Sequence, residues 1–399
     1  MRKSLITTAV LGALAAPTMV FAEDAAPAAP AGPTLMQGMN FPLANNPNPL
    51  SVDAGPLGKV YISGALSGIG LSQSNSVPKA TIGSTTYNEK SQYADISNAQ
   101  VILQKVDGLV QFYVQGGGYS LPTIGTPYVR SSKITDTNYG NIPVAFVKLA
   151  PTDNFSIQAG KLPTLIGTEY AFTFQNTNIE RGLIWDVENV ISRGVQANLT
   201  LGSLALSGAL TDGFYTKDYG YLTGLATYTI NDSNTVALAA GGNPSGTKLA
   251  DIDNKLGTSA ELANSQQYNL YYKNVTGAWT FQPILQYTKV NKDSGLGIAN
   301  SGHTAGGSLI VNYDFNENYS LAARGEYIKE TGNFDFLGYG QGSKAYTFTL
   351  TPTYRQKTFF ARADLSYVKV NDGTSGDLFG TAQKDDTQAR AMGEIGFLF

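Results

Sequence analysis

The chain has 399 residues, with 27 Lys and Arg, 30 Asp and Glu and one His, which gives a net charge of −3 at pH 7. This weakly acidic balance is not the electrostatic footprint of a nucleic-acid-binding protein. No cysteine is present, which excludes disulfides, thiolate zinc sites, iron–sulfur clusters and cysteine nucleophiles.

Residues 1–22 have the features of a secretory signal. Arg2 and Lys3 form a charged start, and an apolar run follows from Leu5 to Val20. Val20-Phe21-Ala22 then forms a plausible cleavage site before Glu23. The run is short for a membrane span of about 20 residues, so cleavage is preferred to the alternative of an uncleaved anchor. Loss of Arg2 and Lys3 leaves 25 basic and 30 acidic residues, a mature net charge of −5.

Residues 23–57 are rich in Ala, Pro and Asn. Proline lacks the N–H group that a sheet needs, so we interpret the segment as a periplasmic tail. A small ordered plug is the alternative.

From Lys59 onward, sixteen stretches alternate apolar and polar residues, a period of two that is typical of β-strands. The predicted strands are 58–71, 92–104, 108–117, 142–150, 154–161, 192–201, 203–211, 222–230, 234–241, 266–274, 277–289, 303–314, 318–329, 345–355, 357–369 and 388–399. Their connections are alternately long and tight. This order predicts an all-β fold, a transmembrane up-and-down antiparallel β-barrel over residues 58–399, with long extracellular loops and short periplasmic turns. An error of two strands would give 14 or 18.

The faces of the later strands support this interpretation. In the last strand Ala391, Ile395 and Phe397 share one face, while Arg390 and Glu394 share the other. The apolar face suits lipid, and the polar face suits a water-filled lumen. The predicted lumen-lining residues are Arg324, Glu326, Arg362, Asp364, Arg390 and Glu394. A soluble β-sandwich with one solvent-exposed face also explains the alternation. It does not explain the charges on successive strands or the regular alternation of long and tight connections.

The third long connection, near 162–191, is rich in apolar residues such as Leu165, Phe172 and Trp185, which need burial. We therefore expect it to fold into the barrel and narrow the lumen, where opposed charges sort solutes by size and charge. The candidates for this constriction are Glu169, Glu180, Arg181, Asp186, Glu188 and Arg193. The alternative is an outward loop with solvated charges.

The segment from Gly160 to Glu169, then Asn176, and Arg193-Gly194-Val195 at the start of the next strand resemble the OmpL-like group of β-barrel porins. The resemblance is sharp over about 160–200 and diffuse elsewhere. It implies an outer-membrane barrel that passes small solutes, and it assigns loop-geometry roles to Gly167, Asn176 and Gly194.

The sequence gives no support for an enzyme. The single histidine, His303, lies at a predicted loop-to-strand junction without an orienting partner in the sequence. The twelve-residue calcium loop and a phosphate-binding loop are both missing, so neither a metal site nor a cofactor is predicted.

The predicted function is a porin of the bacterial outer membrane that lets small hydrophilic solutes or ions diffuse passively. The alternative is a closed structural or adhesive barrel. Expected partners are membrane lipid and the barrel assembly machinery, the latter through the terminal Phe399. Aromatic bands suit either lipid or a neighbouring subunit, so the sequence leaves both a monomer and a homotrimer open.

Overall fold

The computed structural model describes Met36, Leu43, Asn46 and residues 48–77, 80–82, 85–87, 89–252 and 258–399. These residues belong to one structural unit, which runs from Thr34 to Phe399. The predicted signal segment lies outside the described residues, as does most of the predicted tail.

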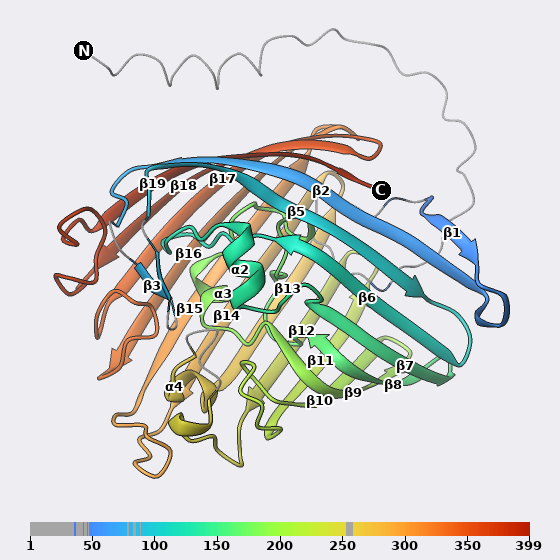
Figure 1. The fold of residues 1–399 in the computed structure, drawn as a ribbon, viewed down its shortest axis with the longest axis horizontal. Helices are drawn as coiled ribbons and strands as arrows, with labels where there is room; N and C mark the ends of the chain where they lie inside the picture. The colour runs from blue at the N-terminus through green and yellow to red at the C-terminus, as the bar shows by residue number, and fades with distance from the viewer. Residues whose placement is uncertain are drawn as a thin grey trace, which may run out of the picture. The chain divides into compact units, whose positions relative to one another are not determined.

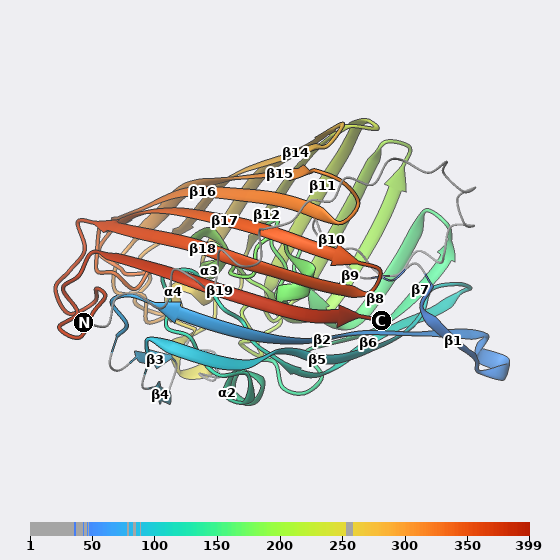
Figure 2. The ribbon, with the colours of Figure 1, turned by 90° about the horizontal axis from the view of Figure 1, so that it is seen from above.

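Sixteen strands form a closed antiparallel sheet, in which each strand pairs with its neighbours in the chain and the last strand, β19, pairs with β2 (Figures 1 and 2). The strands are β2 (Lys59–Gln73), β5 (Gln92–Lys105), β6 (Val110–Tyr119), β7 (Val144–Thr152), β8 (Phe155–Pro163), β9 (Ile191–Leu201), β10 (Leu204–Thr211), β11 (Tyr221–Asn231), β12 (Asn234–Gly242), β13 (Gln266–Thr276), β14 (Trp279–Val290), β15 (Gly302–Asp314), β16 (Tyr319–Gly332), β17 (Lys344–Gln356), β18 (Phe359–Asn371) and β19 (Thr387–Leu398). The prediction of a sixteen-stranded barrel is confirmed. Closure removes the free edges that an open sheet would expose.

The seam between the first and last strands is closed by the C-terminal residue. The backbone N–H of Gly64 donates to the Phe399 carbonyl at 2.9 Å, and the Phe399 N–H donates back to Gly64 at 3.1 Å. Beyond this point β2 continues past the end of β19. The short strand β1 (Leu50–Asp53) pairs there with residues 59–62, and the turn η1 (Gly55–Leu57) connects the two strands. The exposed end of β2 therefore has a partner of its own.

The two faces of each strand differ as the sequence predicts. Outward positions carry exposed apolar side chains such as Leu222 (51% exposed), Leu285 (62%) and Ile395 (57%). Inward positions of the last strand hold Arg390 and Glu394, and both are buried. The outer surface suits a lipid environment, because a charge on the lipid face at mid-depth would cost about 2–4 kcal/mol.

The connections alternate in length. Short turns follow β5, β7, β9, β11, β13, β15 and β17, and longer segments follow β2, β6, β8, β10, β12, β14, β16 and β18. The long segments contain β3 (Ala80–Ile82), β4 (Thr85–Tyr87), α2 (Ser131–Thr137), η2 (Thr173–Gln175), α3 (Leu183–Asp186), η3 (Leu249–Asp251) and α4 (Ala260–Ala263). We call the two ends of the barrel the long-loop end and the short-turn end.

Among the described residues, no helix has the length and apolar character needed to cross a membrane.

Two described residues of the predicted tail lie against the barrel interior. The Met36 N–H donates to the side-chain oxygen of Gln104, an inward residue of β5, at 2.8 Å. Leu43 is buried, in the same apolar cluster as Ala65 and Ile102.

Candidate pore constriction

The third long connection, residues 164–190 between β8 and β9, crosses the interior of the barrel. It hydrogen-bonds to inward side chains on the opposite wall and on both flanks. These wall residues are Asn98 of β5, Gln267 of β13, Gln286 of β14, Arg324 of β16, Thr351 of β17, Arg362 and Asp364 of β18, and Arg390 and Glu394 of β19. We call residues 164–190 the lumen loop. Its many contacts with the wall define its path across the lumen.

Arg324 is the central contact between the wall and the lumen loop. Its Nη1 lies 2.6 Å from Glu169 Oε1 and 2.7 Å from the carbonyl oxygen of Glu180. Nη2 donates to the Thr349 hydroxyl at 3.2 Å, and Nε lies 3.6 Å from the Glu326 carboxylate. The Arg324 side chain is fully buried. Its charge therefore depends on protein partners instead of water.

Arg362 of β18 and Glu394 of β19 form a second anchor, two and three strands further around the wall than Arg324. Arg362 donates through Nε and Nη2 to the Glu394 Oε2 atom at 2.9 and 2.7 Å. Its nitrogens also donate to the carbonyl oxygens of Asn176 and Thr173, both at 2.6 Å. The remaining Glu394 oxygen accepts from the Thr173 hydroxyl at 2.7 Å. The pair thus holds the η2 turn against the wall.

Arg390 connects the lumen loop with the second long connection. Its Nη1 donates to Glu180 Oε1 at 2.6 Å and to the Thr123 carbonyl at 3.0 Å. Its Nη2 donates to the Thr126 carbonyl at 2.7 Å. The backbone of Arg181 pairs with the same stretch, because its carbonyl accepts from Ile124 N–H at 3.0 Å. The two connections therefore form one buried layer.

Carboxylates of the wall hold backbone groups of the lumen loop. Asp364 accepts from the Glu180 N–H at 2.8 Å, and Glu326 accepts from the Leu183 N–H at 3.2 Å. These bonds satisfy amide groups that would otherwise be buried without a partner, which costs about 1–3 kcal/mol each. All six predicted lumen-lining residues thus face inward, and all contact the loop or its partners.

The predicted constriction residues do not share one environment. Glu169 and Glu180 are buried in the ion pairs with Arg324 and Arg390. The guanidinium of Arg181 is buried beside Trp185 and has no hydrogen bond to any described residue. One buried carboxylate oxygen of Glu188 also has no hydrogen bond to any described residue. The sequence predicts that these charges line an opening. In the structure most of them are instead enclosed between the lumen loop and the wall.

Asp186 and Arg193 lie apart from this buried layer. Asp186, the last residue of α3, is exposed and forms no ion pair with a described residue. Arg193 has the strand parity of Val195, which is 48% exposed on the outer face, so Arg193 points away from the lumen. It pairs with Asp212 at 2.6 Å and lies 4.1 Å from the Tyr215 ring. Its placement in the constriction is corrected, because the parity of β9 (Ile191–Leu201) directs its side chain to the outer face.

Close packing restricts the residue type at Gly167 and Gly194, and side-chain hydrogen bonds do so at Asn176. Gly167 has φ +81°, and a Cβ there would lie 2.0 Å from the Glu188 carboxylate. A Cβ on Gly194 would lie 2.2 Å from the Leu210 carbonyl oxygen. The Asn176 side chain accepts from the Tyr170 N–H at 2.7 Å and donates back to the Tyr170 carbonyl at 2.8 Å.

Gly167→Ala is expected to loosen the lumen loop. A non-glycine residue in the left-handed region costs about 1–3 kcal/mol, and here the methyl group also displaces Glu188. Hydrogen exchange measured by mass spectrometry should become faster across residues 164–190 and stay unchanged in the strands. Gly202→Ala is the matched control, since Gly202 has φ +58° in a short turn and no atom within 4 Å of a new Cβ. Equal effects of the two substitutions on the loop would contradict the expectation.

A cavity of about 160 Å³ lies on the other side of the lumen loop, against the wall of β6, β7, β11 and β13. Tyr113 and Phe146 line it as a stacked pair whose ring centroids are 5.4 Å apart. Leu225 and Tyr271 line it from the far wall. The lining of this space thus combines aromatic and aliphatic side chains with polar ones such as Gln115 and Gln175.

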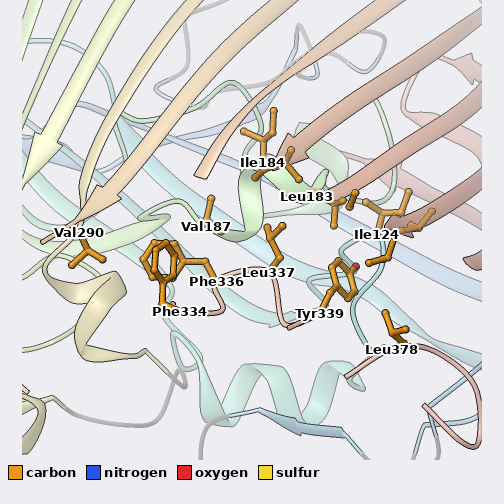
Figure 3. Packing of buried hydrophobic residues seen from close by; sticks show 14 of the residues in the cluster. Ile124, Leu183, Ile184, Val187, Val290, Phe334, Phe336, Leu337, Tyr339 and Leu378 are labelled. Carbon is orange, nitrogen blue, oxygen red and sulfur yellow. The ribbon is translucent and has the colours of Figure 1, made fainter. Parts of the chain in front are cut away.

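Apolar side chains from several long connections cover the lumen loop at the long-loop end. Figure 3 shows Leu183, Ile184 and Val187 of the loop facing Phe336, Leu337 and Tyr339 of the connection between β16 and β17. Ile124 and Leu378 join from two other connections. We call this group the apolar cap. The apolar cap buries the apolar face of α3, in agreement with the prediction that these side chains need burial.

Sequence reasoning missed the amide and aromatic residues of the site. Gln267 and Gln286 donate to the carbonyls of Val187 and Ile184, the latter at 3.0 Å. Their inward parity was visible in the sequence, but their partners lie 80 and 102 residues away in the chain. Nothing in the local pattern marked Tyr113 or Phe146 as neighbours of the loop.

The closed sixteen-stranded barrel with a loop folded into its lumen defines a porin-type protein of the outer membrane. The profile of the family described as "Putative beta-barrel porin-2, OmpL-like" matches residues 59–399. The chain belongs to this family, as the residues around 160–200 suggested.

Solved porin-type structures share the fold at low sequence identity. OmpT of Vibrio cholerae in a trimer form is 10% identical, with a TM-score of 0.54 over 85% of this chain and 99% of that chain. An anion-selective porin from Comamonas acidovorans is 12% identical, with 0.54 over 85% and 99%. The outer membrane channel DcaP of Acinetobacter baumannii is 11% identical, with 0.55 over 85% and 97%. A search of curated proteins found no match.

Proposed function

We propose that this porin is a passive diffusion pore for small hydrophilic solutes, and that the lumen loop sets its narrowest cross-section. A barrel of sixteen strands is wide enough for an aqueous channel, whereas eight strands would be filled by side chains. The barrel holds no energy source, so flux follows the concentration gradient.

The position of the lumen loop is the observation that carries this proposal. The loop is fixed to the wall of β13–β19, where the charged side chains are buried. On the opposite wall, inward residues nearer the short-turn end remain partly accessible, among them Lys148 of β7 and Gln158 of β8. A solute route between the loop and β6–β13, past the cavity, follows from this asymmetry.

The test is single-channel recording of the purified protein in a planar bilayer. A stable open level, together with swelling of liposomes in neutral solutes, is the expected result. Because the ion pairs between loop and wall neutralise most of the lumen charge, we expect only a weak ion preference. Electrical silence of a barrel that still shifts on gels upon boiling would overturn the proposal.

A closed barrel with a structural or adhesive role is the second candidate. The apolar cap favours it, because Phe334, Phe336 and Leu378 are almost completely buried at the long-loop end. The same recording separates the two candidates, since a closed barrel gives no open level.

Two further features concern assembly. A homotrimer is our proposal for the working unit, supported by the trimer form of the similar OmpT. Phe399, which is 42% exposed at the end of the last strand, is proposed as the contact for the barrel assembly machinery.

Export with cleavage after Ala22 completes the proposal, and the mass of the mature chain tests it.

A further inference from the structure

We propose that the cavity beside the lumen loop is a binding site for neutral monocyclic solutes that carry an apolar ring and one hydrogen-bonding group, the chemistry of a phenol. This inference rests on the proposed pore, because a solute reaches the cavity only through the lumen. It narrows the solute class from small hydrophilic molecules in general to one with an apolar face.

The size of the cavity suits one ring. Its volume is about 160 Å³. An apolar protein cavity of about 150 Å³ accommodates benzene.

The walls of the cavity suit an apolar face. Phe146 and Tyr113 line one side as a stacked pair, and Phe172 lines the loop side. Aromatic rings attract one another in offset-stacked or edge-to-face arrangements at centroid distances of about 4.5–7 Å. Leu225 and Ile191 add aliphatic surface. A bound ring would thus meet carbon atoms on several sides.

Two polar groups at the cavity are available to a ligand. The Tyr170 hydroxyl and the Gln175 amide nitrogen have no hydrogen-bond partner among the described residues, although both residues line the cavity. Gln115 is already engaged, since it accepts from the Tyr113 hydroxyl at 2.7 Å and donates to Gln100. The site can therefore satisfy a hydroxyl group on the ring, but not the five hydroxyls of a hexose, whose burial without partners is costly.

Charge excludes the ionised relatives of such a solute. Glu169 is the one carboxylate at the cavity, and no Lys or Arg side chain of the described residues lines it. Both Glu169 oxygens are engaged, one by Arg324 and the other by the Gly182 N–H at 2.9 Å. A benzoate would find no cation there, and burying an unpaired carboxylate is strongly unfavourable.

The test measures binding without any current. The fluorine NMR signal of 4-fluorophenol is titrated against the full-length protein in detergent, with 4-fluorobenzoate and glucose competition as separate arms. We expect saturable binding of 4-fluorophenol, no saturable binding of 4-fluorobenzoate, and no displacement by glucose. Partition into micelles gives only a linear, non-saturable change.

Two variants locate the site. Leu225→Trp fills the cavity and is expected to abolish the saturable component, while Leu222→Trp on the outer face of the same strand, 51% exposed, should preserve it. Gln175→Leu removes one hydrogen bond to the solute. It should weaken the binding of 4-fluorophenol about fivefold and have little effect on the binding of fluorobenzene. This second variant keeps the test decisive should Leu225→Trp fail to fold.

The outcomes separate this inference from the proposed pore. The proposed binding site would be overturned if 4-fluorophenol showed only the linear change of micelle partition. Equal binding to the Leu225→Trp and Leu222→Trp variants would also overturn it. A barrel that is silent in bilayers and yet binds 4-fluorophenol saturably would contradict the pore and support the site. An open pore without saturable binding of 4-fluorophenol would support the pore and contradict the binding site.

Discussion

Replacement of residues 169–188 by a short glycine–serine linker should raise the single-channel conductance at least about twofold, because this segment fills a large part of a lumen that sixteen strands leave open. The ends of the deletion lie close together, since the Thr164 N–H donates to the Val190 carbonyl at 2.9 Å. The strands on both sides keep their pairing. The barrel should therefore fold without the segment.

The control for this deletion is a loop that does not cross the lumen. Residues 381–384, between β18 and β19, are mostly exposed, and their removal should leave the conductance at the wild-type level. Conductance that stays unchanged or falls after loss of residues 169–188 would show that the solute route does not pass this loop. It would also weaken the interpretation of the neighbouring cavity as part of that route.

The strands could be predicted from the sequence because their physics is local. Every second residue faces lipid, so a charge at the wrong parity would be costly, and the pattern around Arg390, Ile395 and Phe397 shows this directly. The turns between paired strands are short and rich in turn formers. The position of the lumen loop was also predictable in outline, because Leu183, Trp185 and their apolar neighbours require burial that an exposed loop cannot provide.

The partners of the loop charges could not be predicted in the same way. Glu169 and Arg324 are 155 residues apart in the chain, and no local pattern connects them. The sequence suggested charges that face a solute, whereas burial beneath the apolar cap forces them to pair with the wall. Arg193 is different: it already lies in the predicted strand 192–201, and its parity with Val195, visible in the sequence, places it on the outer face.

This pairing of buried charges has a direct consequence for Arg324→Met. The substitution leaves the Glu169 and Glu326 carboxylates buried without their guanidinium, and breaking such a pair costs about 3–5 kcal/mol. The lumen loop can relieve this cost by leaving the wall around Glu169, because both carboxylates are then hydrated. We expect higher and noisier single-channel currents from a barrel whose strands remain folded, as judged by its gel shift on boiling.

Two comparisons separate loss of the ion pairs from loss of a positive charge anywhere in the lumen. Arg355→Met removes a partly exposed arginine whose pair with Asp314 spans 3.2 Å near the short-turn end, and exposed pairs contribute only about 0–1 kcal/mol. Its currents should match the wild type. The triple variant Glu169→Gln, Arg324→Met, Glu326→Gln carries no unpaired charge and should regain the quiet, lower conductance. Noise that persists in the triple variant would mean that Arg324 holds the loop mainly through its bond to the Glu180 carbonyl, because that bond is lost in both variants.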